Sequence, residues 1–253
     1  MMPESSYNIW DIALILVVAL QGTALAYLYN PKWKALVLTL PIPFTVSVLA
    51  IGRPIDATNV TGLIALLLFT NGVRWLHWHA RCPIIISIVV ASAGYCVIGA
   101  ILAKLIPPSD LAFWLSCAFV LILAGFLHFN ASHREEKGKK LELAVWLKFP
   151  ILVCVVCLLV LMKRALLGFM TVFPMVGVIA AYEGRHCLGT ISRQIPVVML
   201  TLVPMMMVCR LSQPQFGLPA ALGLGWAALF MILIPITGHM WRNNERKRTL
   251  QNN

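Results

Sequence analysis

Apolar and polar residues follow one another along this chain in long blocks. Apolar stretches of about 20 residues, the length that a membrane-spanning helix requires, are separated by short polar connections. Nine such stretches are present, at 9–29, 33–51, 59–78, 83–106, 109–129, 142–162, 165–182, 190–209 and 216–240. The pattern predicts an all-α, polytopic membrane helix bundle of about nine transmembrane spans.

Composition excludes a soluble enzyme. Of the residues, 60% are apolar and only 11% are charged, whereas a soluble domain carries about 25% charged residues. The net charge of +11 is spread over short runs between apolar stretches, which is typical of membrane loops and not of a nucleic-acid interface. No Walker loop, Rossmann glycine pattern, HExxH or GxSxG is present, so we predict no catalytic residue, metal or cofactor.

Basic residues are unequally divided between the two sets of alternating loops. With nine spans, thirteen Lys and Arg residues fall on one side and five on the other. The richer side is expected to be cytoplasmic. The N-terminus is then periplasmic, and the basic tail 242–253 is cytoplasmic.

The two halves of the chain match each other weakly. A shift of 132 residues places Thr39 on Thr171, and Gly52-Arg53 on Gly184-Arg185. Five spans separate equivalent points, so the copies are expected to have opposite orientations, as in many secondary transporters. A miscounted span would make the repeats parallel instead. The predicted units are a first repeat (1–107), a linker span with a basic loop (108–141), a second repeat (142–241) and the tail (242–253).

Both copies contain a span that is interrupted by proline. Pro41 and Pro43 interrupt one, and Pro174 interrupts the other. Proline frees backbone carbonyl groups, which lipid cannot satisfy. Corresponding broken spans therefore indicate a transporter binding site, although a packing kink is the alternative.

Polar residues concentrate directly after the two breaks. The candidate substrate-binding residues are Arg53, Asp56, Asn59, Thr61, Tyr182, Glu183, Arg185 and Arg193. Arginine at a helix start suits a carboxylate or phosphate, and the alternative is a lipid headgroup anchor. Asp11 and Glu142 begin equivalent spans and are candidates for proton coupling, or are interfacial carboxylates.

His77 and His79 form a second polar cluster, in RWLHWHAR (74–81). Haem or metal ligation would require a further ligand, because two helix residues at this spacing do not share a face. We favour an aromatic and basic belt at the membrane interface, and a redox or lipid-modifying enzyme is the weaker hypothesis.

The second half of the chain resembles the GlpM-like family of bacterial inner-membrane proteins. The resemblance depends on LLGFMTVFPMVGVIAAYEG (166–184), SRQIPVVMLTLVPMM (192–206) and FGLPAALGLGWAALFMIL (216–233). Phe173-Pro174, Tyr182 and Arg193 match the family pattern, whereas Ala181 stands where the family usually has histidine. The first half (36–78) is a looser copy. The resemblance implies an inner-membrane location.

Together these features predict a small secondary transporter or lipid flippase. Its substrate would be a small or lipid-linked anion, held between the two broken spans. The alternative is a non-catalytic accessory protein that supports the export of envelope polysaccharide or lipid. The expected partners are membrane lipids and the anionic substrate, with a homodimer left open and no nucleic acid.

Overall fold

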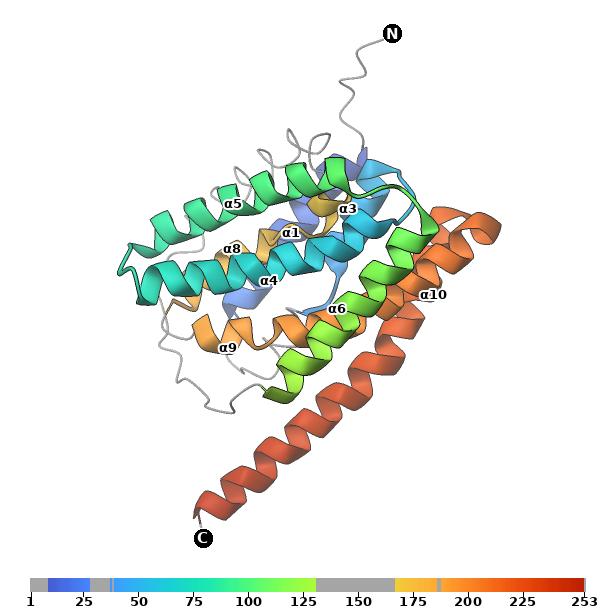
Figure 1. Ribbon diagram of the computed structural model, residues 1–253. Helices are drawn as coiled ribbons and strands as arrows, with labels where there is room; N and C mark the ends of the chain where they lie inside the picture. The colour runs from blue at the N-terminus through green and yellow to red at the C-terminus, as the bar shows by residue number, and fades with distance from the viewer. Residues whose placement is uncertain (1–8, 28–36, 38, 131–166, 186–187, 253) are drawn as a thin grey trace.

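Every element that the structure describes is a helix. The computed structural model describes residues 9–27, 37, 39–130, 167–185 and 188–252 (Figure 1). In chain order the elements are α1 (Ile9–Tyr27), α3 (Ile42–Ile51), α4 (Ala57–Trp78), α5 (Ile84–Leu105), α6 (Asp110–Asn130), the 3₁₀ helix η1 (Leu167–Val172), α8 (Met175–Glu183), α9 (Leu188–Ser192) and α10 (Ile195–Asn252). No strand occurs among these residues, so the predicted all-α class is confirmed.

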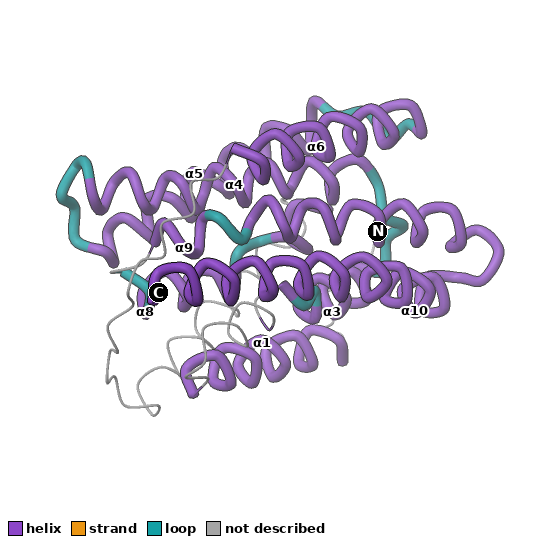
Figure 2. Tube along the Cα trace, turned by 90° about the horizontal axis from the view of Figure 1, so that it is seen from below, coloured by secondary structure: helices purple, strands orange, loops and turns teal. Residues whose placement is uncertain are grey.

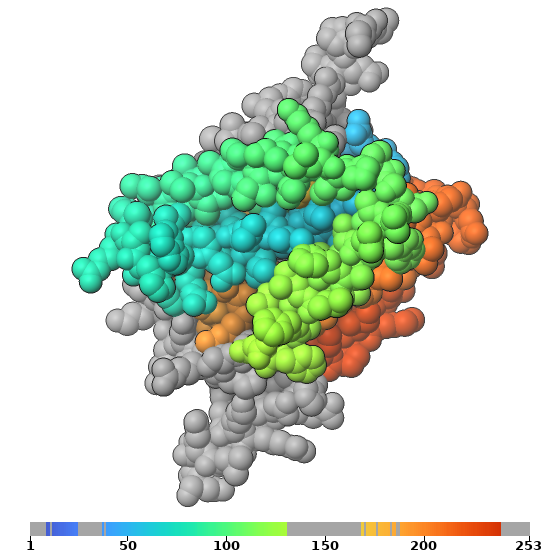
Figure 3. Space-filling view, in the orientation of Figure 1, coloured from blue at the N-terminus to red at the C-terminus, as the bar shows by residue number. Residues whose placement is uncertain are grey.

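Among the residues that the structure describes, four helical segments are long and apolar enough to cross a membrane. They are α4, α5, α6 and Leu188–Gly238, which comprises α9 and much of α10. In Figure 3, α5 and α6 cover much of the visible face. The exposed side chains Leu111, Leu115, Phe119 and Ile122 follow one side of α6, since spacings of three and four residues share a helix face. Such a face suits hydrocarbon.

α4 is the central helix of the bundle. It packs against α5, α6, η1, α9 and α10, and Figure 2 shows it beside α5. Its mean hydropathy, 1.2, is the lowest of the four segments, and Thr58, Asn59 and Thr70 are buried on it. Because lipid offers no hydrogen-bond partners, the polar side chains of a membrane bundle are expected on a helix in its interior.

α10 is bent back on itself at Gly217. This residue has φ 76° and ψ 167°, a conformation that glycine adopts at little cost. The first arm (195–216) and second arm (218–252) lie against each other, and the Cys209 thiol donates to the Ala221 carbonyl at 3.3 Å. The bend agrees with the separation expected between the spans at 190–209 and 216–240.

The spans predicted at 33–51 and 165–182 are both interrupted at proline, as the sequence indicates, and neither is one continuous helix. In the first, α3 begins only at Ile42, and in the second, Pro174 separates η1 from α8. Proline has no N–H to donate and crowds the preceding turn, so neither segment continues as one α-helix. The span predicted at 142–162 lies outside the described residues.

Candidate functional site

α3 and α8 both begin directly after a proline with the same unusual backbone conformation. Pro41 has φ −83° and ψ 43°, and Pro174 has φ −73° and ψ 52°. Among the described side chains, none caps either helix. The first α-helical hydrogen bonds run from Thr45 N–H to the Pro41 carbonyl and from Val178 N–H to the Pro174 carbonyl. In these first turns Pro43 has no N–H, and the Met175 N–H donates to the Phe173 carbonyl at 2.7 Å. The N–H groups of the remaining first-turn residues lack a helical acceptor.

The two helices leave their breaks in opposite directions. η1 and α8 run parallel to α4, because a Cβ on Gly62 would lie 3.2 Å from Val172 and one on Gly177 would lie 3.8 Å from Phe69. α3 runs the other way: its first turn shares a cavity with Leu66 in the middle of α4, and its end precedes the start of α4. The positive ends of both helix dipoles therefore face the same region.

A cavity of about 120 Å³, which we call the break cavity, lies between these helix starts. Pro41 and Pro43 line it from one break, and Pro174 lines it from the other. Its polar lining residues are Gln21, Thr39, Thr70, Thr171 and Gln194. Thr39 and Thr171 are the pair that the internal match superposes, so the matched segments meet at this cavity.

Gln21 compensates for a hydrogen bond that Pro41 cannot make. In a continuous helix the Val37 carbonyl would accept from the N–H of residue 41, which proline lacks. The Gln21 side-chain Nε2 donates to that carbonyl at 2.9 Å and lies 3.5 Å from the Leu40 carbonyl oxygen. Because carbonyl oxygens only accept, the amide nitrogen must face them. The buried Oε1 has no partner among the described residues.

Gln194 adds a second oxygen of the same kind. Its Oε1 is buried and has no partner in the described part of the chain, and the residue lines the break cavity from the turn before α10. Native proteins rarely leave buried polar atoms unpaired. Two unpaired amide oxygens at one cavity therefore indicate a site where a ligand or a water molecule donates the missing hydrogen bonds.

A smaller cavity of about 20 Å³, the outer pocket, lies beside the break cavity. Arg53, Asp56 and Asn59 line it together with Gly168 and Thr171. Thr171 lines both cavities. Its hydroxyl accepts a hydrogen bond from Asn59 Nδ2 at 2.9 Å and donates to the Gly168 carbonyl at 2.6 Å. A hydrogen-bonded pair from α4 and η1 therefore stands where the cavities adjoin.

Asp56 and Asn59 also form the N-terminal cap of α4. The Asp56 carboxylate accepts from the Thr58 N–H at 2.8 Å, and the Asn59 side-chain oxygen accepts from the Asp56 N–H at 2.8 Å. This reciprocal pair is a capping box. Thr61 donates to the Ala57 carbonyl within its own helix. The structure thus gives Asp56 and Thr61 local structural roles.

The other predicted site residues are dispersed. Tyr182 packs at the edge of the core formed by α1, α4, α5 and α8. Arg185 and Arg193 are half-buried and are absent from the described lining of both cavities. Arg53 is exposed at the outer pocket. The side chains of Glu183 and Asp11, and all of Glu142, lie outside the described residues.

His77 closes the turn between α4 and α5. Its Nδ1 lies 2.9 Å from the Cys82 carbonyl oxygen, and since that oxygen only accepts, the ring nitrogen is the donor. His79 is the C-terminal cap residue of α4 and is exposed. The geometry assigns His77 a structural contact.

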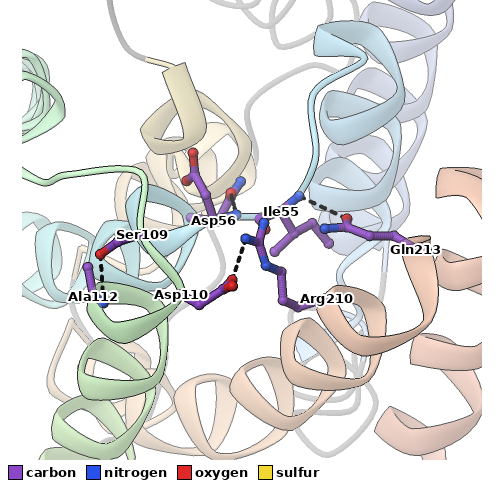
Figure 4. Close-up of polar contacts among 8 residues, drawn as sticks. Ile55, Asp56, Ser109, Asp110, Ala112, Arg210 and Gln213 are labelled. Carbon is purple, nitrogen blue, oxygen red and sulfur yellow. Dashed lines mark hydrogen bonds and ion pairs between the residues drawn. The ribbon is translucent and has the colours of Figure 1, made fainter. Parts of the chain in front are cut away.

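The linker from α3 to α4 is held by side chains of α10. Arg210 donates to the Ile55 carbonyl at 2.9 Å and to Asp110 Oδ1 at 2.6 Å, and Gln213 Oε1 accepts from the Ile55 N–H at 3.1 Å (Figure 4). Both backbone groups of Ile55 are thereby satisfied by one helix arm. The contact fixes the start of α4, and with it the outer pocket.

Replacement of Arg210 by methionine is expected to lower the free energy of unfolding by about 1–2 kcal/mol, because the Ile55 carbonyl loses its partner. The ion pair itself contributes little, since the Asp110 side chain is 75% exposed. Asp110→Ala is therefore the matched control and should change stability by under about 0.5 kcal/mol. Unfolding in mixed detergent micelles measures the free energy of unfolding of both variants. Equal losses in the two variants would contradict the assigned role of Arg210.

Comparison with known proteins does not place the chain in a family. No family model matches it, and no curated protein or solved structure matches it either.

Proposed function

We propose that the protein is a small secondary transporter whose substrate site is the break cavity. The observation that carries the proposal is the meeting of two oppositely directed helix starts at one cavity within the bundle. Discontinuous helices with their positive ends at a shared site hold anionic groups in secondary transporters. The proposed substrate is a small anion, and a lipid-linked anion would make the protein a flippase.

The proposed architecture is an inverted repeat of about nine spans. Under the internal match, α4 corresponds to α9 and the first arm of α10. These segments are antiparallel, since Ser192 donates to Asn71 near one end of α4 at 3.0 Å, while Arg210 reaches Ile55 at its other end. Antiparallel equivalents are what inversion requires.

The proposed location is the bacterial inner membrane, with a periplasmic N-terminus and a cytoplasmic C-terminus. The GlpM-like resemblance and the loop charges support this placement. Ile55, Asp110 and Arg210 lie in connections or helix ends that the nine-span topology assigns to one side, and they are in contact in the structure.

We assign the outer pocket as the access route to the break cavity from one side. Arg53 is exposed at this pocket, where its charge would attract an anion before it enters. Thr171 lines both cavities and accepts a hydrogen bond from Asn59 of the outer pocket. Substrate would pass when that bond opens.

A charge-matched pair of thiol reagents tests the proposal. Val198 lines the break cavity, and Val198→Cys is a small change in volume. In a chain whose seven native cysteines are replaced by alanine, a sulfonate-bearing methanethiosulfonate should modify this cysteine roughly tenfold faster than its trimethylammonium counterpart, because two helix starts favour anions. Rates are normalised to Gln215→Cys, an exposed position near the bend of α10. Equal or reversed normalised rates would contradict an anion site.

A further inference from the structure

The break cavity offers acceptors as well as donors. Gln21 is only 6% exposed, and its amide nitrogen is committed to the Val37 carbonyl. The amide oxygen and nitrogen therefore cannot exchange places without breaking that bond. Gln194 also lines the cavity, and its Oε1 is a second buried oxygen without a partner among the described residues.

A simple anion would satisfy only part of this site. The helix starts supply N–H donors, which suit a carboxylate or phosphate. The Gln21 amide oxygen can only accept, and its nitrogen is held by the Val37 carbonyl, so a ligand without a donor leaves this oxygen desolvated and unpaired. A hydroxyl or ammonium group on the ligand would supply the hydrogen-bond donor that an unpaired amide oxygen lacks.

The walls and the volume limit the rest of the ligand. Apart from the polar residues named above, side chains such as Phe44, Phe173 and Leu202 line the cavity. Its volume of about 120 Å³ compares with about 150 Å³ for a cavity that accommodates benzene. The space therefore suits about six non-hydrogen atoms.

We propose that the break cavity selects compact carboxylates that also carry a hydroxyl or ammonium donor, such as short 2-hydroxy acids. The inference rests on the proposed function and names its substrate class. The anionic group faces the starts of α3 and α8, and the donor faces Gln21 and Gln194.

Equilibrium dialysis of labelled lactate and propanoate against the full chain in phosphatidylcholine nanodiscs tests this selection. The two acids differ by one hydroxyl. Lactate is expected to bind roughly tenfold more tightly, because a site built for a donor rejects the analogue that lacks it. Gln194→Leu should abolish most of the difference, whereas Ser212→Ala, whose hydroxyl bonds its own helix, should preserve it.

The outcomes separate this inference from the proposed function. Equal binding of lactate and propanoate would overturn the donor requirement and leave an anion site in place. Equal binding of lactate and neutral 1,2-propanediol would overturn the anion site itself. If neither acid binds, compact hydroxy acids are excluded, whatever the thiol reagents show at Val198→Cys.

Nanodiscs with and without phosphatidylglycerol distinguish a free acid from a lipid headgroup of the same chemistry. Unchanged lactate binding in both lipids supports a free acid. Loss of lactate binding on addition of phosphatidylglycerol would show that the headgroup occupies the cavity, and would overturn selection of free acids.

Discussion

Replacement of Gly168 by alanine is expected to destabilise the protein by about 3 kcal/mol or more, at the upper end of overpacking effects. A Cβ at this position would overlap the Thr58 hydroxyl and lie 2.8 Å from the Asn59 backbone nitrogen. The first turn of α4 is fixed by its capping box, so it cannot yield. η1 must instead move away from α4, which also separates Asn59 from Thr171.

Unfolding of the purified chain in mixed detergent micelles measures this loss. Gly94→Ala is the matched control, because nothing lies within 4 Å of a Cβ at that position, and alanine favours the helix. Stability of Gly168→Ala equal to that of the control would show that η1 does not pack on α4 as described.

Gly225→Ala is expected to have the second-largest effect, about 2 kcal/mol of lost stability. The two arms of α10 pack closely here: a Cβ would overlap the Cys209 sulfur and lie 3.0 Å from Met205 Cγ and 3.2 Å from the Met205 carbonyl oxygen. Small residues permit such close approach between membrane helices. The arms would be forced apart near the bend at Gly217.

A second substitution makes this prediction specific. Cys209→Ala removes the overlapping sulfur and should recover about half of the loss, while the contact with the Met205 backbone remains. Gly223→Ala, two residues away on the same arm with no atom within 4 Å of its Cβ, should be neutral or slightly stabilising. Additive effects of the changes at 209 and 225 would contradict direct contact.

The helical class, the bend of α10 and both proline breaks could be predicted from the sequence. Proline and glycine act locally, so their positions are sufficient to locate an interruption. That Thr39 and Thr171 line one cavity agrees with the internal match. Helix lengths were harder to predict, since apolar composition at 33–51 does not reveal that α3 begins only at Ile42.

The polar lining of the break cavity was largely missed. Gln21 stands within an apolar span and could have been singled out as an isolated polar residue. Nothing local to it reveals the Val37 carbonyl, however, because that contact depends on how α1 packs near the break. The predicted arginines stand out in the sequence by their charge, yet charge alone does not place a side chain in a cavity.

The position of Asp56 at the start of α4 could be predicted from the sequence. An aspartate followed three residues later by asparagine, before an apolar run, is typical of a helix N-terminus. The structure shows that reciprocal cap. Asn59 combines the cap with a hydrogen bond to Thr171, and this second role requires the tertiary structure.

Two-sided modification of Val198→Cys tests most directly whether the break cavity belongs to a transporter. The membrane-impermeant sulfonate reagent is applied to intact cells in one experiment and to inverted membrane vesicles in the other, using the chain that lacks native cysteines. A transport site must open in turn to each side, so the cysteine should react from both. Reaction from one side only, or from neither, would contradict transport through this cavity and would favour an accessory membrane protein.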